Sequence, residues 1–318
     1  MHGSNNTEKV WVGFITYGEI TAPYLPYFLQ SLYHQTYTNL EIVCFDNTPE
    51  AINENTEILE AHSEITVFRE DGNTGFSHAY NVLLNKARAA HARYFLIINP
   101  DTLLEPDVID RLVSSLEANP HYGSVSPKIH RWNFTARTKT SYIDSCGLVL
   151  KNGLQFSDLG QGEEDRSQYD ANLIMGASGA AGLFRLEALA VVAENGKYFD
   201  EYFFMYKEDC DLAYRLNVYG YTAKLVPQAL VYHDRTATGG SFWQRFAHRH
   251  GRSKVANRYS FINQHFLYIK YWSRQEISGK LKILIWVCIR FFEALILEQY
   301  LLGSYPFILK GLKVLKKY

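Results

Sequence analysis

Short apolar segments alternate with helix-like segments through the first 120 residues, and this alternation restricts the fold more than any other feature. Segments 10–16, 40–46, 65–70 and 93–99 have the length and apolar character of buried strands. Because a strand followed by a helix normally returns as a parallel strand, the pattern predicts an α/β fold with a doubly wound, mostly parallel sheet. The predicted helices cover 24–35, 51–62 and 77–91, and another starts at 106.

The second half of the chain has a less regular pattern. Small residues fill 176–184, and the spacing predicts a helix over 208–219 that ends at Gly220. Segments 222–227 and 229–234 are predicted to be edge strands. We therefore expect one large domain, or one domain with a C-terminal appendage.

Composition limits the class of protein. With 318 residues and 47% hydrophobic content, the chain can bury a sizeable core. Its four cysteines form no C-x-x-C pair, so neither a disulfide framework nor a zinc cluster is indicated and a reducing, cytoplasmic compartment is expected. Residues 1–9 are polar and lack the apolar stretch of a secretory signal, which predicts a disordered or tag-derived tail.

Charge is distributed unevenly along the chain. Residues 1–234 contain 17 Lys and Arg against 30 Asp and Glu, whereas residues 235–318 contain 15 against 3. The stretch 243–260 mixes basic and aromatic side chains. Such a surface fits nucleic acid, pyrophosphate or an anionic membrane, and a solvated helical face explains it about as well. Nucleic acid is not among the partners that we expect.

The motifs that usually bind phosphate are absent from the sequence. There is neither a G-x-G-x-x-G after the first strand nor a G-x-x-x-x-G-K-[ST] anywhere, which disfavours dinucleotide dehydrogenases and P-loop NTPases. The remaining general solution is a divalent cation held by one or two carboxylates and by the phosphate oxygens of the substrate. Asp101 suits this role, because Pro100 ends the preceding apolar strand and leaves Asp101 at its carboxyl edge.

Polar residues at other strand and helix ends have both a functional and a structural explanation. Asp46 and Asn47 end the second predicted strand, where they fit either a base edge or an ordinary turn. Asn73 and Gly75 precede a helix whose amino end fits either an anionic phosphate or a cap. His233 follows an apolar strand and is either structural or a metal ligand.

Three carboxylates crowd the start of the helix predicted for 208–219. They belong to Glu208, Asp209 and Asp211. Acidic residues in a first helical turn are ordinary partners of the helix dipole. A carboxylate within reach of a hydroxyl group can also act as a general base. Asp211, at i+3 from Glu208, is expected to tie the helix to its surroundings.

In their order along the chain, these features resemble the inverting family 2 glycosyltransferases, which have the Rossmann-like GT-A fold. The resemblance covers roughly residues 10–240 and is closest to the bacterial rhamnosyltransferase and galactofuranosyltransferase branch. It rests on an opening strand with Thr16 and Tyr17, the Asp46-Asn47 pair, N-x-G at 73–75 with Asn81, N-P-D at 99–101, the small-residue segment, E-D-x-D-L at 208–212, and His233.

The resemblance implies a role for each matching position. Asp101 and His233 would hold Mg²⁺ or Mn²⁺, with Asn99 where many relatives have the first Asp of D-x-D. Asp209 would be the catalytic base, and Glu208 is the next candidate. The donor nucleotide would be bound by Thr16, Tyr17, Asp46, Asn47, Asn73, Gly75, Asn81 and Asn99.

The same resemblance divides the chain and suggests a reaction. Residues 10–120 would bind the nucleotide sugar, 121–240 would form the acceptor side, and 241–318 would be a basic, helical and amphipathic extension. The expected reaction transfers a sugar from a nucleoside diphosphate to a hydroxyl of a saccharide or lipid-linked acceptor in bacterial polysaccharide synthesis, with inversion. dTDP-rhamnose is the favoured donor, and UDP-sugars also fit.

The C-terminal segment 281–302 is strongly apolar but contains Lys282, Arg290, Glu293 and Glu298. Each charge at the centre of a spanning helix would cost about 2.5–3.5 kcal/mol. An interfacial amphipathic helix, anchored by the basic residues that follow, is therefore favoured over a spanning one, which would place the protein on the inner face of the plasma membrane. The alternative is a helix packed on the catalytic domain or on a second subunit in a homodimer.

Two other functional classes remain open. A sugar-phosphate nucleotidyltransferase also places a nucleotide on such a sheet, but 14–25 lacks the glycine-rich, lysine-bearing loop of that class. A non-catalytic nucleotide-sugar-binding relative is favoured by Asn99 and disfavoured by Asp101, Asp209 and His233.

Overall fold

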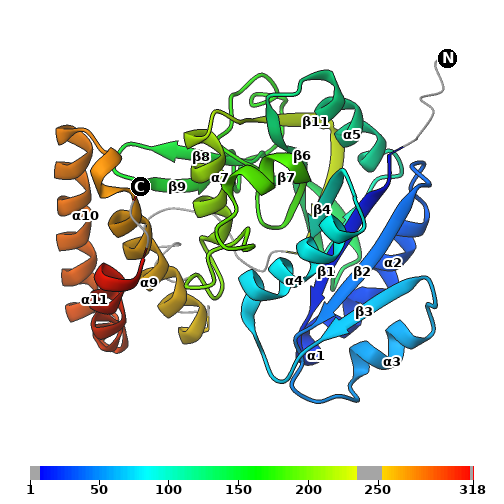
Figure 1. Ribbon diagram of the computed structural model, residues 1–318, viewed down its shortest axis with the longest axis horizontal. Coiled ribbons are helices and arrows are strands. Elements are labelled where there is room, and N and C mark those ends of the chain that lie inside the picture. The colour runs from blue at the N-terminus through cyan, green and yellow to red at the C-terminus, as the bar shows by residue number, and fades with distance from the viewer. Residues whose placement is uncertain (1–7, 235–252, 316–317) are drawn as a thin grey trace.

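A nine-stranded sheet with helices on both faces forms the centre of the molecule (Figure 1). This computed structural model describes residues 8–234, 253–315 and 318. Residues 1–7 of the predicted tail and most of the basic stretch 243–260 lie outside that part of the chain. The sheet has the order β3 (Ile65–Arg69), β2 (Leu40–Asp46), β1 (Val10–Thr16), β4 (Tyr94–Ile98), β10 (Ala181–Arg185), β6 (Tyr122–Asn133), β11 (Thr222–His233) and β5 (Thr102–Leu104), and β7 (Thr138–Ser145) pairs with β6.

The four strands predicted in the first half are confirmed within one residue at each end. β3, β2, β1 and β4 are all parallel. Beyond β4 the sheet becomes mixed, because β10 runs antiparallel to both β4 and β6. A helix forms at each predicted helical stretch. These helices are α2 (Leu25–Tyr33), α3 (Glu54–Glu60), α4 (Gly75–Ala89), α5 (Val108–Ala118) and α7 (Glu208–Val218).

The prediction of two edge strands at 222–227 and 229–234 is wrong. The two segments form one strand, β11, which pairs with β6 on one side and, through 231–233, with β5 on the other. The ladder with β6 has a register shift between Val226 and Leu230, and Pro227 lies inside it. A proline that cannot donate to the ladder is tolerated at such a bulge, so it interrupts the pattern without ending the strand.

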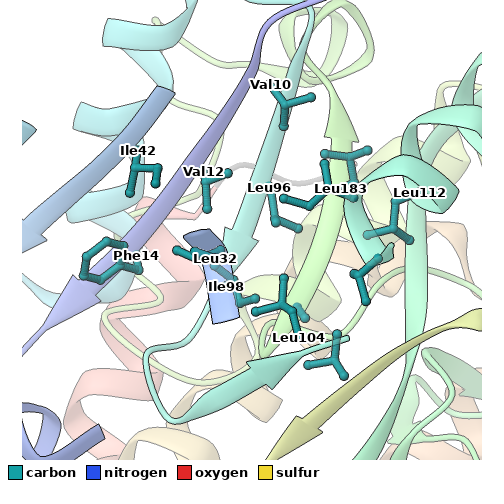
Figure 2. Packing of buried hydrophobic residues seen from close by; sticks show 14 of the residues in the cluster. Val10, Val12, Phe14, Leu32, Ile42, Leu96, Ile98, Leu104, Leu112 and Leu183 are labelled. Atoms are coloured by element: carbon teal, nitrogen blue, oxygen red, sulfur yellow. The ribbon is translucent and has the colours of Figure 1, made fainter. Parts of the chain in front are cut away.

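Two hydrophobic cores lie on opposite faces of the sheet. In β1, Val10, Val12 and Phe14 face the core formed with α2, α3 and α5, part of which Figure 2 shows. Trp11, on the opposite face, packs in the core formed with α4, α6 (Leu186–Val192) and α7. The strict alternation along β1 follows from the period of two in a strand.

A third core attaches the C-terminal helices to the domain. It joins Phe203 and α7 to the hairpin β8 (Leu148–Lys151)–β9 (Gln155–Asp158) and to α9 (Lys254–Tyr271), α10 (Ile277–Ile296) and α11 (Tyr305–Val314). Figure 1 shows these helices at the end of the molecule away from β3 and α3. The apolar segment 281–302 is therefore not one helix, since α10 ends at Ile296 and a 3₁₀ turn, Gln299–Ser304, follows. Within the described residues, no helix combines the length and apolarity that a membrane span requires.

Candidate active site

Asp101 and His233 meet at the edge of the sheet. The chain leaves β4 at Ile98, turns through Pro100, and enters β5 directly after Asp101. β5 pairs with the end of β11, so Asp101 and His233 lie next to each other, with 3.2 Å between Asp101 Oδ1 and His233 Nε2. The other ring nitrogen, Nδ1, donates to Asp144 Oδ2 over 2.8 Å. Asp144 thus fixes the ring so that Nε2 faces Asp101.

The charge of this cluster suits a cation. Burial lowers the pKa of His233, but Asp101 and Asp144 outweigh it and raise the pKa to about 10. Apart from its ion pair with His233, the buried Oδ1 atom of Asp101 has no hydrogen-bond partner within the described part of the chain. A carboxylate oxygen and an imidazole nitrogen that converge in this way are ordinary ligands of a divalent metal, which would displace the Nε2 proton on binding.

The pair by itself is an incomplete metal site. Among the described residues, no group of three or more His, Cys, Asp or Glu side chains is arranged to hold a metal. Mg²⁺ and Mn²⁺ sites in phosphate-binding enzymes often have only one or two protein ligands, and substrate oxygens and water fill the remaining positions. The residues therefore fit a metal that binds together with an anionic substrate.

Arg131 is a residue of this edge that the sequence did not single out. It lies on β6 in register with His233 on β11, so both side chains project from the same face of the sheet. Its Nε and Nη2 atoms are buried and have no acceptor in the described residues. Leaving a buried guanidinium without an acceptor is unfavourable, so an anion here would be stabilised. The signal in the sequence was a charged residue within a strand. Arg131 has this signal on β6, and Asp144, which the sequence analysis also missed, has it on β7.

Asp209 lies in the first turn of α7, and two hydrogen bonds connect it to the same sheet edge. Its Oδ2 accepts the backbone N–H of Gly179 over 3.0 Å. The next carbonyl, that of Ala180, accepts the N–H of Asn99 over 2.9 Å, two residues before Asp101. The structure therefore brings Asp209 and Asp101 to one edge, from parts of the chain more than a hundred residues apart.

Glu208, the neighbour of Asp209, has a different environment. Its side chain is 6% exposed, and Oε2 is buried without a hydrogen bond in the described residues. Burial and the adjacent charge of Asp209 raise its pKa well above 4.5. Asp209 is half-buried and receives two backbone N–H groups, from Gly179 and Cys210. Of the two carboxylates, Asp209 is the more accessible and the one that backbone N–H groups orient.

The backbone before α7 adopts an unusual conformation. Tyr206 and Lys207 have φ values of 69° and 70°, in the left-handed region. For residues other than Gly, Asn or Asp this costs about 1–2 kcal/mol each. Such conformations persist where neighbouring groups hold them, and they cluster at functional sites.

On the donor side, Asp46 is fully engaged within the protein. It is 0% exposed, and its carboxylate accepts hydrogen bonds from the hydroxyl groups of Thr16 and Thr48 and from the side-chain amide of Asn53. Asp46 therefore shapes the loop after β2 and leaves no exposed carboxylate oxygen for a base. Thr16, also 0% exposed, supports Asp46.

Asn47, Asn73 and Gly75 form one connected turn at the start of α4. Asn47 donates to the carbonyl of Gly75 over 3.1 Å and accepts from the N–H of Thr74 over 3.0 Å. Asn73 accepts the Gly75 N–H over 2.9 Å, so the first N–H group of this helix is already bound within the protein. Gly75 has φ +83°, and a Cβ there would meet Phe204 at 2.6 Å.

The other predicted donor residues differ in their surroundings. Asn81 is 3% exposed and holds the 198–201 segment through bonds to the backbone of Tyr198 and Phe199. Tyr17 is 42% exposed and free to contact a ligand by stacking. Asn99 is half-buried beside Asp101. The structure thus gives Asn81 a structural role and leaves Tyr17 and Asn99 accessible.

Comparison with known proteins identifies relatives of this chain. The family model described as Glycosyl transferase family 2 matches residues 11–192. Two curated Mycobacterium tuberculosis proteins, from strains CDC 1551 / Oshkosh and ATCC 25618 / H37Rv, are named N-acetylglucosaminyl-diphospho-decaprenol L-rhamnosyltransferase. Each is 24% identical over 266 residues, which cover 74% of this chain and 78% of the relative.

Solved structures share the fold. GalNAc-T7 with UDP, GalNAc and Mn²⁺ has a TM-score of 0.59 at 14% identity, over 84% of this chain and 49% of that protein, so this chain spans about half its length. The mannosyltransferase PcManGT from Pyrobaculum calidifontis, with GDP-Man and Mn²⁺, has a TM-score of 0.51 at 18% identity, over 98% and 88%. These likenesses confirm the predicted GT-A-like fold.

Proposed function

Because this chain belongs to glycosyl transferase family 2, we propose that it transfers a sugar from a nucleoside diphosphate donor to a hydroxyl group, with inversion at the anomeric carbon. The observation that carries the proposal is the approach of Asp209 and Asp101 to one sheet edge through Gly179, Ala180 and Asn99. One carboxylate is thereby available at each end of the bond that breaks.

Asp209 acts on the acceptor. Its carboxylate takes the proton of the acceptor hydroxyl as that oxygen attacks the anomeric carbon. The N–H groups of Gly179 and Cys210 orient the carboxylate. Attack from the side opposite the leaving diphosphate inverts the configuration. Glu208 is 6% exposed and is therefore less accessible to an acceptor hydroxyl than Asp209.

Asp101, His233 and Arg131 act on the leaving group. Asp101 and His233 would hold Mg²⁺ or Mn²⁺, which supplies Lewis-acid stabilisation of the departing diphosphate. Asp144 keeps His233 in the ligating orientation. The Nε and Nη2 groups of Arg131, which have no acceptor among the described residues, donate to a phosphate oxygen. The presence of Mn²⁺ with two structural relatives, GalNAc-T7 and PcManGT, supports divalent metal use.

The donor nucleotide lies over the carboxyl ends of β1 and β2 and the start of α4, beside Tyr17, Asn73 and Asn99. Asp46 and Asn47 hold the loops that would carry it. dTDP-rhamnose is the favoured donor, and the support for it is the rhamnosyltransferase name of the mycobacterial relatives. UDP- and GDP-sugars are also tested as donors, because GalNAc-T7 was solved with UDP and PcManGT with GDP-Man.

The acceptor is proposed to be a saccharide carried on a lipid at the inner face of the plasma membrane. Helix α10 buries only Gly279, Ile283 and Ala294, so most of its apolar residues face outward. Exposed Lys282, Lys310 and Lys313 on α10 and α11 complement anionic lipid headgroups. We expect the protein to sediment with anionic vesicles. The double variant Leu284→Glu/Phe292→Glu places two negative charges on the exposed face of α10 and should remain in solution. Equal sedimentation of both would contradict this docking.

The reaction is tested by incubating the protein with Mn²⁺, an acceptor panel and individual dTDP-, UDP- and GDP-sugars. Release of a nucleoside diphosphate that requires Asp101 and Asp209 supports the proposal. Formation of pyrophosphate from a nucleoside triphosphate and a sugar phosphate would show a nucleotidyltransferase instead. Donor binding without turnover under all conditions would show a non-catalytic binding protein.

A further inference from the structure

The strained turn before α7 is held by one buried side chain of the C-terminal extension. Asn263, on α9, is 0% exposed, and its Nδ2 donates to the carbonyls of Met205 and Tyr206 over 2.8 and 2.7 Å. We propose that Asn263 is a positioning residue, which holds residues 205–207 in the conformation that directs Asp209 at the acceptor. This inference rests on the proposed function, with Asp209 as the base.

The turn needs external support because of its sequence. Tyr206 and Lys207 are both left-handed, and neither is a residue type that adopts this conformation readily. The segment is held from two sides. On the side of α4, Phe76 N–H donates to the carbonyl of Phe204 over 2.8 Å. On the side of α9, Tyr259 stacks on Phe204 with ring centroids 5.1 Å apart, and Asn263 binds the next two carbonyls.

The position of Asp209 depends on this turn. Within the described residues, its side chain receives one hydrogen bond from outside α7, from the N–H of Gly179. The direction of the carboxylate is therefore set mainly by the way the chain enters the helix. A catalytic group displaced by about 1 Å commonly loses roughly a hundredfold in rate.

Helix α9 also fixes the far side of the same helical turn. Lys270 and Tyr271 contact Asp211 Oδ1, each over 2.7 Å. Helix α9 therefore contacts the start of α7 at two points, through Asn263 before Asp209 and through Lys270 and Tyr271 after it. Since the family model matches only residues 11–192, the base and the helix that positions it both lie beyond the matched segment. The C-terminal extension thus completes the catalytic site as well as carrying the apolar surface of α10.

The test compares two neighbouring amides of α9. Asn263→Ala removes the two bonds to the turn, and Gln264→Ala removes a similar bond, 2.9 Å long, from Gln264 to the carbonyl of Leu154. We expect Asn263→Ala to lower kcat by about 10- to 100-fold with the donor KM changed less than about twofold, and Gln264→Ala to leave both within about twofold. Adding Lys207→Gly to Asn263→Ala should restore part of kcat, because glycine adopts the left-handed conformation without strain.

Amide hydrogen exchange over residues 203–211 gives a readout independent of turnover. Exchange should be faster in Asn263→Ala than in Gln264→Ala or the wild type; Asn263→Ser replaces Asn263→Ala if the latter does not fold. Equal kcat in the Asn263 and Gln264 variants, a loss confined to the donor KM, or unchanged exchange would overturn the inference. A folded wild type that transfers no sugar from any donor would refute the proposed function instead, and the exchange comparison would still decide whether Asn263 holds the turn.

Discussion

The buried charge of Asp211 should contribute strongly to the stability of this protein. Asp211 is 0% exposed, and its carboxylate receives Arg215 Nε over 2.9 Å and Lys270 Nζ and the Tyr271 hydroxyl over 2.7 Å each. Asp211→Asn removes the charge and turns an N–H donor toward two buried cations. Breaking a buried pair in this way typically costs about 3–5 kcal/mol.

The structure places the expected loss near the lower end of that range. After the substitution, Lys270 keeps Asp200 as a partner over 2.7 Å, and Arg215 keeps the carbonyls of Val192 and Tyr198. We therefore expect a loss of about 3 kcal/mol in the free energy of unfolding. For a chain of 318 residues, with an unfolding entropy of about 2 cal/mol/K per residue, this corresponds to a fall in Tm of about 4–5 °C.

Urea unfolding followed by circular dichroism measures the loss, and the chain offers a matched control. Asp107 and Arg111 form the same i, i+4 pair on the surface, where the side chains are 43% and 42% exposed, so Asp107→Asn should cost less than about 1 kcal/mol. Burial raises the pKa of Asp211, but Lys270 and Arg215 outweigh it and lower the pKa below 3.8. The stabilisation is therefore complete above pH about 4 and declines as the pH falls further. A difference of under about 1 kcal/mol between the two variants at pH 7 would refute the reasoning.

Two further substitutions test the carboxylates of the site. Asp209→Asn should lower the rate of sugar transfer by about 10²- to 10⁴-fold, which is the usual contribution of a general base. Its affinity for a nucleoside diphosphate with Mn²⁺, measured by calorimetry, should stay within about twofold of the wild type. A transfer rate near that of the wild type would show that Asp209 is not the base. Glu208→Gln should become more stable relative to the wild type as the pH rises above 4.5, because the raised pKa of buried Glu208 makes its ionisation unfavourable in the folded state. Urea unfolding at pH 4.5 and 7.5 measures this, and a pH-independent difference would contradict it.

The local sequence was sufficient to predict most of the elements, and it singled out Asp101, Asp209 and His233 as candidates. Apolar runs placed β1 and β2 at their observed bounds, Pro100 marked the end of β4, and Gly220, with φ +87°, followed the end of α7. The reason is that apolar spacing, proline and glycine act through neighbouring residues. The same reasoning failed at Pro227, where a bulge allowed one strand to continue and the partner strands β6 and β5 decided the outcome.

Only the tertiary structure determined which side chains meet. His233 is held by Asp144, 89 residues away, and the turn before Asp209 is held by Asn263 from α9. Asp46, which the sequence places among ligand contacts, is instead enclosed by Thr16, Thr48 and Asn53. Such contacts depend on strand register and on the docking of distant elements, and a periodic pattern of residues records only which face of an element is buried. The sequence therefore singled out candidate groups for the site, and the packing of the sheet, α7 and α9 decided how these groups are positioned.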